Sequence, residues 1–130
     1  MVLTYNFYDV LTIAFGAAFG ANTRYQIYKK LEQINVSKRF IILVINISSS
    51  FFLGLFLSIL SDNSSLSYYD QLVLFFSIGL LGSLSTYSSF IYDLYELCIK
   101  FQFKRALKLF IISITLGMAS FAVGFVLGMH

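Results

Sequence analysis

An apolar segment at residues 71–97 constrains this chain most, because it is long enough to cross a bilayer yet is interrupted near its middle. Residues 79–90 within it read GLLGSLSTYSSF, with glycines and hydroxyls where a plain spanning helix would carry Leu and Ile. Inside hydrocarbon every backbone N–H and C=O needs an internal partner, so a broken helix persists there only where protein or an ion pathway covers it. Small residues also let helices pack closely, which is the simpler alternative. So many glycines and hydroxyls together favour a discontinuous helix that lines an ion site.

The composition is that of an integral membrane protein. Of 130 residues, 58% are hydrophobic and only 12% are charged, as in chains that span bilayers. A spanning helix needs about 20 apolar residues, and four such spans fit, at residues 10–28, 40–60, 71–97 and 109–129. We therefore expect an all-α membrane protein, a single four-span domain over residues 1–130. Its third helix should be broken near the middle.

The spans lack the side chains that several function classes require. No charged residue lies in the middle of a span, which argues against proton-coupled export and favours passive permeation. No pairing of acid with base, or of nucleophile with base, stands out, so we do not expect an enzyme. No basic patch is interleaved with aromatic residues outside the spans, so nucleic-acid binding is not expected either.

Three polar features inside or beside the spans have two interpretations each. Asn46 could offer amide donors to an anion or make an interhelical hydrogen bond. Arg24 could be an arginine reaching the membrane surface or a structural residue at a pore mouth. A stripe at helical spacing could line a path or pack against a neighbouring helix. The small-xxx-small pattern of Gly16 and Gly20, by contrast, indicates only a close approach of two helices. The stripe consists of Ser113, Gly117, Ser120 and Gly124.

Three motifs together resemble one known family. Residues 20–25, GANTRY, resemble its G-A-x-x-R-Y, and Val44, Asn46, Phe51 and Gly54 resemble its V-N-x-x-G-x-F-x-x-G. Residues 82–90, GSLSTYSSF, resemble G-G-x-T-T-F-S-T-F. In this order, and over nearly the whole chain, they identify it as a member of the Fluc (CrcB-like) family of fluoride channels.

The resemblance implies an antiparallel dimer with two fluoride pathways, in which each subunit helps cytoplasmic fluoride to leave the cell passively. It implies a structural sodium ion at the dimer centre, held by the backbone carbonyls of Gly82 and Ser85. It further implies an ion pathway lined by an asparagine, two aromatic rings and a hydroxyl, because ring edges can face an anion. Those positions are Asn46, Tyr87, Phe90 and Ser113.

The chain departs from the family pattern at four positions. Ser49 replaces a glycine of the second motif, and Tyr87 replaces the first phenylalanine of the pathway. Leu109 stands where the family has a tyrosine before the serine track, and Gly117 stands where the track continues with serine. These departures keep a non-conducting structural or assembly subunit open as an alternative. A small four-span exporter is less favoured, because the first span has no carboxylate.

The basic residues predict an orientation. Alternating spans place residues 29–39 and 100–108 on one side, and both termini and residues 61–70 on the other. All nine Lys and Arg residues lie on the first side or at its membrane edge, so that side should be cytoplasmic and both termini extracellular. An antiparallel homodimer would need half its copies inverted. We therefore expect a heterodimer with a homologous subunit of opposite charge bias, although a homodimer remains possible.

Overall fold

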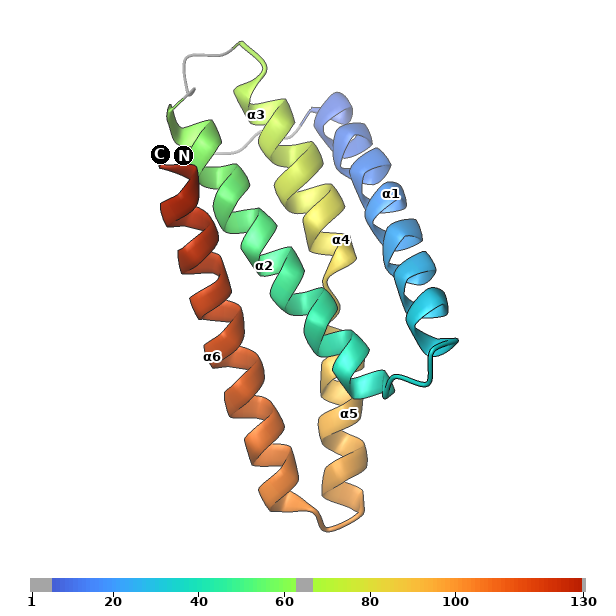
Figure 1. Cartoon of the computed structure of the whole chain (residues 1–130). Coiled ribbons are helices and arrows are strands. Elements are labelled where there is room, and N and C mark those ends of the chain that lie inside the picture. The colour runs from blue at the N-terminus through green and yellow to red at the C-terminus, as the bar shows by residue number, and fades with distance from the viewer. Residues whose placement is uncertain (1–5, 63–66, 130) are drawn as a thin grey trace.

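The computed structural model describes residues 6–62 and 67–129 as a bundle of long helices (Figure 1). The first two are α1, Phe7–Glu32, and α2, Lys38–Asp62. A third rod is assembled from shorter pieces: α3 (Tyr69–Leu72), η1 (Val73–Leu81), α4 (Gly82–Leu84) and α5 (Tyr87–Ile99). The last helix, α6, spans Phe103–Gly128. The expected all-α class is confirmed.

Three of the described rods are long and apolar enough to cross a membrane. They are Lys38–Ser61, Tyr69–Ile99 and Phe103–Gly128. The 26 residues of α1 give it the length of a span, but Asn22, Arg24 and Gln26 lower the hydropathy of its second half. The expectation of four strongly apolar spans is therefore met by three, and α1 has the length of a span without its composition.

Close backbone contacts fix α1 against the third rod. Gly16 and Gly20 are buried where α1 meets η1. A Cβ at Gly20 would overlap the carbonyl oxygen of Leu80 and the Ser83 hydroxyl. The small-xxx-small pattern of α1 thus brings two backbones into contact, as it does between membrane helices. Because Arg24 lies one turn beyond Gly20, this contact also sets where Arg24 meets the third rod.

Among the helices that the structure describes, α2 and α6 form the most extensive pair. Ser120 Oγ of α6 donates a hydrogen bond to the Ile47 carbonyl of α2 at 2.9 Å. A Cβ at Gly124 would overlap the Phe51 carbonyl oxygen. From Ser120 to Gly124, the small-residue stripe of α6 therefore packs against α2. Helix packing, one of its two interpretations, accounts for that part of the stripe.

The backbone of Val73–Leu81 is a π-helix of nine residues, which leads directly into α4. Such helices are rare, usually only one turn long, and often lie beside functional sites. The hydrophobic run VLFFSIGLL gives no sign of this wider winding, since its continuous apolar character has no periodicity to distinguish one helix type from another. The π-helix ends beside Gly82.

Few side chains are buried within one chain. The core lies where α2 crosses η1 and α4, and it consists of Ile41, Ile45, Leu81 and Leu84. Only 6% of the apolar window of α6 is buried. Most of that apolar surface must therefore face lipid or a second subunit.

The two ends of the bundle differ in charge. In Figure 1, α1 and α3 begin at one end, where α2 and α6 also finish, while the α1–α2 and α5–α6 turns lie at the other end. Eight of the nine Lys and Arg residues belong to those two turns or to the helix ends beside them, and Arg24 lies further inside. The grouping of the basic residues expected from the sequence is thus present in the fold.

Candidate functional site

The backbone of Ser85 and Thr86 is extended between α4 and α5, and we call these two residues the extended pair. Ser85 has φ −67° and ψ 155°, and Thr86 has φ −139° and ψ 109°. The N–H of Ser85 still donates to the Leu81 carbonyl at 3.1 Å, which closes the last turn before the pair. Helical geometry resumes at Tyr87.

Hydroxyl side chains favour this local conformation. Ser85 Oγ donates to the Gly82 carbonyl at 3.2 Å. Thr86 is the N-cap of α5: its Oγ1 accepts from the N–H of Ser89 at 3.3 Å and donates to Ser89 Oγ at 3.0 Å. Serine and threonine bond readily to nearby backbone groups, so they favour caps over helix interiors. The sequence STYSS can therefore end one helix and begin the next without proline.

Two side chains from other helices pair the backbone groups of the extended pair, and we call them the clamp residues. Asn46 of α2 accepts at Oδ1 from the Thr86 N–H at 2.8 Å and donates from Nδ2 to the Thr86 carbonyl at 3.2 Å. Arg24 of α1 donates from Nη1 to the Ser85 carbonyl at 3.2 Å. A continuous helix would pair these groups internally, and in hydrocarbon each unpaired one would cost several kcal/mol.

Asn46 thus makes an interhelical contact, the second of its two interpretations. Its amide bonds both backbone groups of one residue, so its orientation is fixed. A carboxamide carries two N–H donors, and only one of them is used on Thr86. The other remains for a further acceptor, so the structural role and a contact with an anion are compatible.

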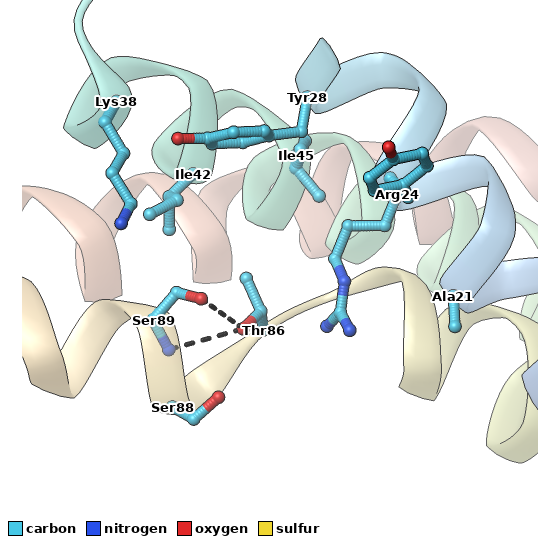
Figure 2. A pocket seen from close by; sticks show the side chains of 10 residues that line it. Ala21, Arg24, Tyr28, Lys38, Ile42, Ile45, Thr86, Ser88 and Ser89 are labelled. Carbon is cyan, nitrogen blue, oxygen red and sulfur yellow. Dashed lines mark hydrogen bonds between the residues drawn. The ribbon is translucent and has the colours of Figure 1, made fainter.

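A cavity of about 360 Å³ opens beside the clamp residues, between α1, α2 and the start of α5 (Figure 2). Figure 2 shows Arg24 and Lys38 entering from different helices, with Thr86 and Ser89 between them. The N-terminus of α5, which carries a partial positive charge, also lies at this cavity. None of the lining residues is acidic, so the cavity suits an anion: Ala21, Arg24, Tyr25, Tyr28, Lys38, Ile42, Ile45, Thr86, Ser88 and Ser89.

Aromatic rings lie on the first turn of α5. The ring centroids of Tyr87 and Phe90 are 6.4 Å apart, and Phe90 stacks on Phe110 of α6 at 6.3 Å with an interplanar angle of 23°. Tyr87 is 76% exposed, so its ring faces away from this chain. Ser113 is half-buried on the same helix as Phe110, three residues further on, and it is not among the residues that line the cavity.

Gly82 and Ser85, the expected sodium ligands, have carbonyls that already accept one hydrogen bond each. The donors are Ser85 Oγ and Arg24 Nη1. A carbonyl oxygen has two lone pairs, so each keeps an acceptor position, and Gly82 is exposed. A cavity of about 90 Å³ adjoins both residues, and one of its serines, Ser77, has a buried hydroxyl without a partner in the described part of the chain.

These oxygens fit a hard monovalent cation, which binds to carbonyl and hydroxyl ligands. Two carbonyls of one chain are too few for a complete shell, so a second subunit or water would have to supply the rest. The Arg24 guanidinium is a competing cation at the Ser85 carbonyl. The Gly82 carbonyl is therefore a better sodium ligand than the Ser85 carbonyl.

The sequence did not single out four residues that the fold brings to this region. Lys38 lies two turns before Asn46 on α2, a spacing that could have revealed it. Thr86 and Ser89 are three residues apart, the spacing at which an N-cap side chain accepts from the backbone of the first helical turn, so this pair could also have been found. Phe110 could not have been found, because its contact with Phe90 depends on the packing of α5 against α6.

Known proteins match nearly the whole chain. Residues 11–125 match the model of the family described as CrcB-like protein, Camphor Resistance (CrcB). The chain is 53% identical over 120 residues to fluoride-specific ion channel FluC 2 of Prochlorococcus marinus (strain NATL2A), covering 92% of this chain and 97% of that protein. It is 30% identical over 122 residues to fluoride-specific ion channel FluC 1 of Parasynechococcus marenigrum (strain WH8102), with 94% of each covered.

An all-helical chain with several apolar rods of spanning length is a multi-pass membrane protein, and its matches are ion channels rather than enzymes. This chain belongs to the Fluc, or CrcB-like, family of fluoride ion channels.

Proposed function

We propose that this chain is a subunit of a fluoride-selective channel that lets cytoplasmic fluoride leave the cell passively. The observation that carries the proposal is the extended pair, held by Arg24 and Asn46 beside a cavity with two cations and no carboxylate. The extended pair is the discontinuity of the third span, and the clamp residues let it persist in a membrane. The relatives' names supply the ion, since they are fluoride-specific channels.

Fluoride enters from the basic end through the cavity beside the clamp residues. Arg24 and Lys38 attract the anion there, and the second N–H of Asn46 offers it a donor. The ring edges of Tyr87 and Phe90 and the hydroxyl of Ser113 line the path beyond. Donors and ring edges are needed because a bare anion in an apolar span loses its hydration, which is very costly without replacement.

The assembly is an antiparallel dimer. An apolar groove of about 350 Å³ between α2 and the η1–α4 segment supports this, because one chain leaves it open beside the exposed Gly82. A second subunit placed there would bury the groove, whose lining residues are Phe52, Leu55, Phe56, Ile59, Phe76, Leu80, Leu81 and Leu84. α1, despite its lower hydropathy, is the remaining span of each subunit.

The Gly82 and Ser85 carbonyls would hold a sodium ion at the dimer centre, and Gly82 would be the better ligand because Arg24 already bonds the Ser85 carbonyl. When bound, the ion would supply a fixed positive charge beside the extended pair. Sodium should then raise the melting temperature of the purified dimer above its value in N-methylglucamine buffer of equal ionic strength. An identical melting temperature in both buffers would remove the sodium assignment.

The partner is a homologous subunit of opposite orientation rather than a second copy. The concentration of basic residues at one end supports a single orientation for this chain. Numbered relatives, FluC 1 and FluC 2, support the existence of paired subunits. In a heterodimer one pathway can be kept while the other decays, which would accommodate Tyr87, Leu109 and Gly117.

Fluoride efflux from liposomes tests these proposals. We expect little flux from the chain alone, and a fluoride-selective leak without a proton gradient once the homologous subunit is added. Chloride-loaded liposomes serve as the ion control. Robust fluoride flux from the single chain would overturn the heterodimer, and absence of flux in every combination would overturn the channel.

Two variants test whether residues of this chain line the fluoride path. Phe90→Ile keeps bulk but removes the ring edge, and Asn46→Ala removes the amide donors, so both should reduce flux through the heterodimer. Phe15→Ile is the matched control, because Phe15 is 63% exposed on α1, away from the extended pair. Unchanged flux in both test variants would favour the alternative, a non-conducting assembly subunit.

A further inference from the structure

The turn between α5 and α6 places a phenylalanine where glycine is usual. Phe101 has φ 55°, in the left-handed region. Its N–H donates to the Cys98 carbonyl at 3.0 Å, and the N–H of Gln102 donates to the Leu97 carbonyl at 2.9 Å. This pair of bonds is the Schellman motif, whose left-handed position is normally glycine because a Cβ is unfavourable there. An outlier of this kind calls for a functional explanation of the side chain.

Packing within the chain does not explain Phe101. Its side chain is 83% exposed, more than any other large apolar residue in the described part of the chain. Its ring contact is an edge-to-face one with Phe103, at 6.2 Å between centroids, and Phe103 is itself 58% exposed. Within residues 6–62 and 67–129, the second non-glycine residue in the left-handed region is Asn35, at φ 56°, and asparagine tolerates this conformation.

Basic residues flank the two rings in the sequence. Residues 97–108 contain four of them and no carboxylate, and all four are exposed: Lys100, Lys104, Arg105 and Lys108. Lys100 pairs with Glu96, and Arg105 donates to the Gln102 side chain at 3.0 Å. The turn therefore combines exposed aromatic rings with a local positive charge.

The position of the turn matches the membrane surface. The 26 residues of α6 extend about 39 Å, which exceeds a hydrocarbon core of about 30 Å. The cations lie at the start of α6, so we expect the part of α6 that extends beyond the hydrocarbon core to be its first turns, at the basic end. In Figure 1 the α5–α6 turn lies further out than the α1–α2 turn.

We propose that the α5–α6 turn is an anchor for anionic phospholipids of the leaflet at the basic end. The rings of Phe101 and Phe103 lie at the boundary between headgroups and acyl chains, where aromatic side chains are favoured. Lys104, Arg105 and Lys108 bind the lipid phosphates, as basic residues beside a span do. The charge complementarity and the exposed rings both fit this occupant, and neither depends on which ion the protein conducts.

The absence of tryptophan from the chain makes the test direct. Phe101→Trp introduces a single indole, to be reconstituted in mixed phosphatidylcholine and phosphatidylglycerol vesicles with bromine on the acyl chains of one lipid. We expect stronger quenching when the anionic lipid is brominated, corresponding to about fivefold local enrichment. Phe7→Trp, at the opposite end and 73% exposed in the parent chain, should show no preference.

Two further variants separate an anchor from a structural turn. Adding Lys104→Gln, Arg105→Gln and Lys108→Gln to Phe101→Trp should remove the lipid preference while quenching persists. Phe101→Gly should raise thermal stability in detergent by relieving the backbone, and lose that gain in anionic vesicles. Equal quenching by both lipids, or an indole that neither lipid quenches because water or a second subunit covers it, would overturn the proposal.

Discussion

The side chains of Arg24 and Asn46 supply the hydrogen-bond partners that a continuous helix would supply from its own backbone. They pair three backbone groups of Ser85 and Thr86, from two different helices. Both residue types could be located in the sequence, and both were expected near an ion path. Their bonding to the backbone could not be predicted, because an amide or a guanidinium can serve an ion and a carbonyl equally well.

Replacing Asn46 by alanine should destabilise the protein by about 1–3 kcal/mol, because two backbone groups of Thr86 lose their partner. Thermal unfolding in detergent measures this. Asn22→Ala is the control, since Asn22 is exposed on α1 and makes only a surface contact with Gln26. Equal loss in both variants would mean that the clamp contributes nothing specific.

Arg24→Lys and Arg24→Gln should separate charge from hydrogen bonding. Lysine keeps the positive charge beside the cavity, and both variants lose the bond from the guanidinium to the Ser85 carbonyl. We expect similar losses of thermal stability, but a larger loss of fluoride efflux in the glutamine variant. Equal efflux in the two variants would show that the cavity does not need the charge.

At the scale of helices, the contact of α1 with the third rod depends on glycine. A side chain at Gly20 would overlap the backbone at Leu80, so Gly20→Ala should force the helices apart and destabilise by about 1–3 kcal/mol. Gly117→Ala is the matched control, because the nearest atom to its Cβ would be Ser50 Oγ at 3.7 Å. That variant should be neutral or stabilising by up to about 1 kcal/mol. A reversed order in thermal unfolding would contradict the packing.

The third rod shows how far the sequence can be interpreted. Residues 71–97 predict its span, and residues 79–90 contain its run of hydroxyls. The π-helix could not be predicted, because a uniformly apolar run fits several windings. α1 is a weaker span than its length suggests, because Asn22, Arg24 and Gln26 interrupt the apolar character of its second half.

At the scale of the whole molecule, the basic residues of the chain gather at one end. Cys98, the only cysteine, is exposed near the same end, so it reports orientation without added tags. A membrane-impermeant thiol reagent should leave Cys98 unlabelled in intact cells and label it in inverted vesicles. Labelling of about half the molecules in both preparations would indicate dual orientation and remove the charge argument for a heterodimer.

The clamp also determines which parts of the chain can be exchanged. α1 and α2 each donate or accept hydrogen bonds at the extended pair. A chimera that takes only one of these three segments from a distant relative would therefore combine clamp residues and backbone groups that do not fit one another. α6 contributes no hydrogen bond to Ser85 or Thr86 among the described residues, so exchanging it leaves the clamp intact, provided that Ser120 and Gly124 still pack against α2. Recombination between relatives is therefore expected to tolerate a crossover in the α5–α6 turn and to reject one between α1 and α2.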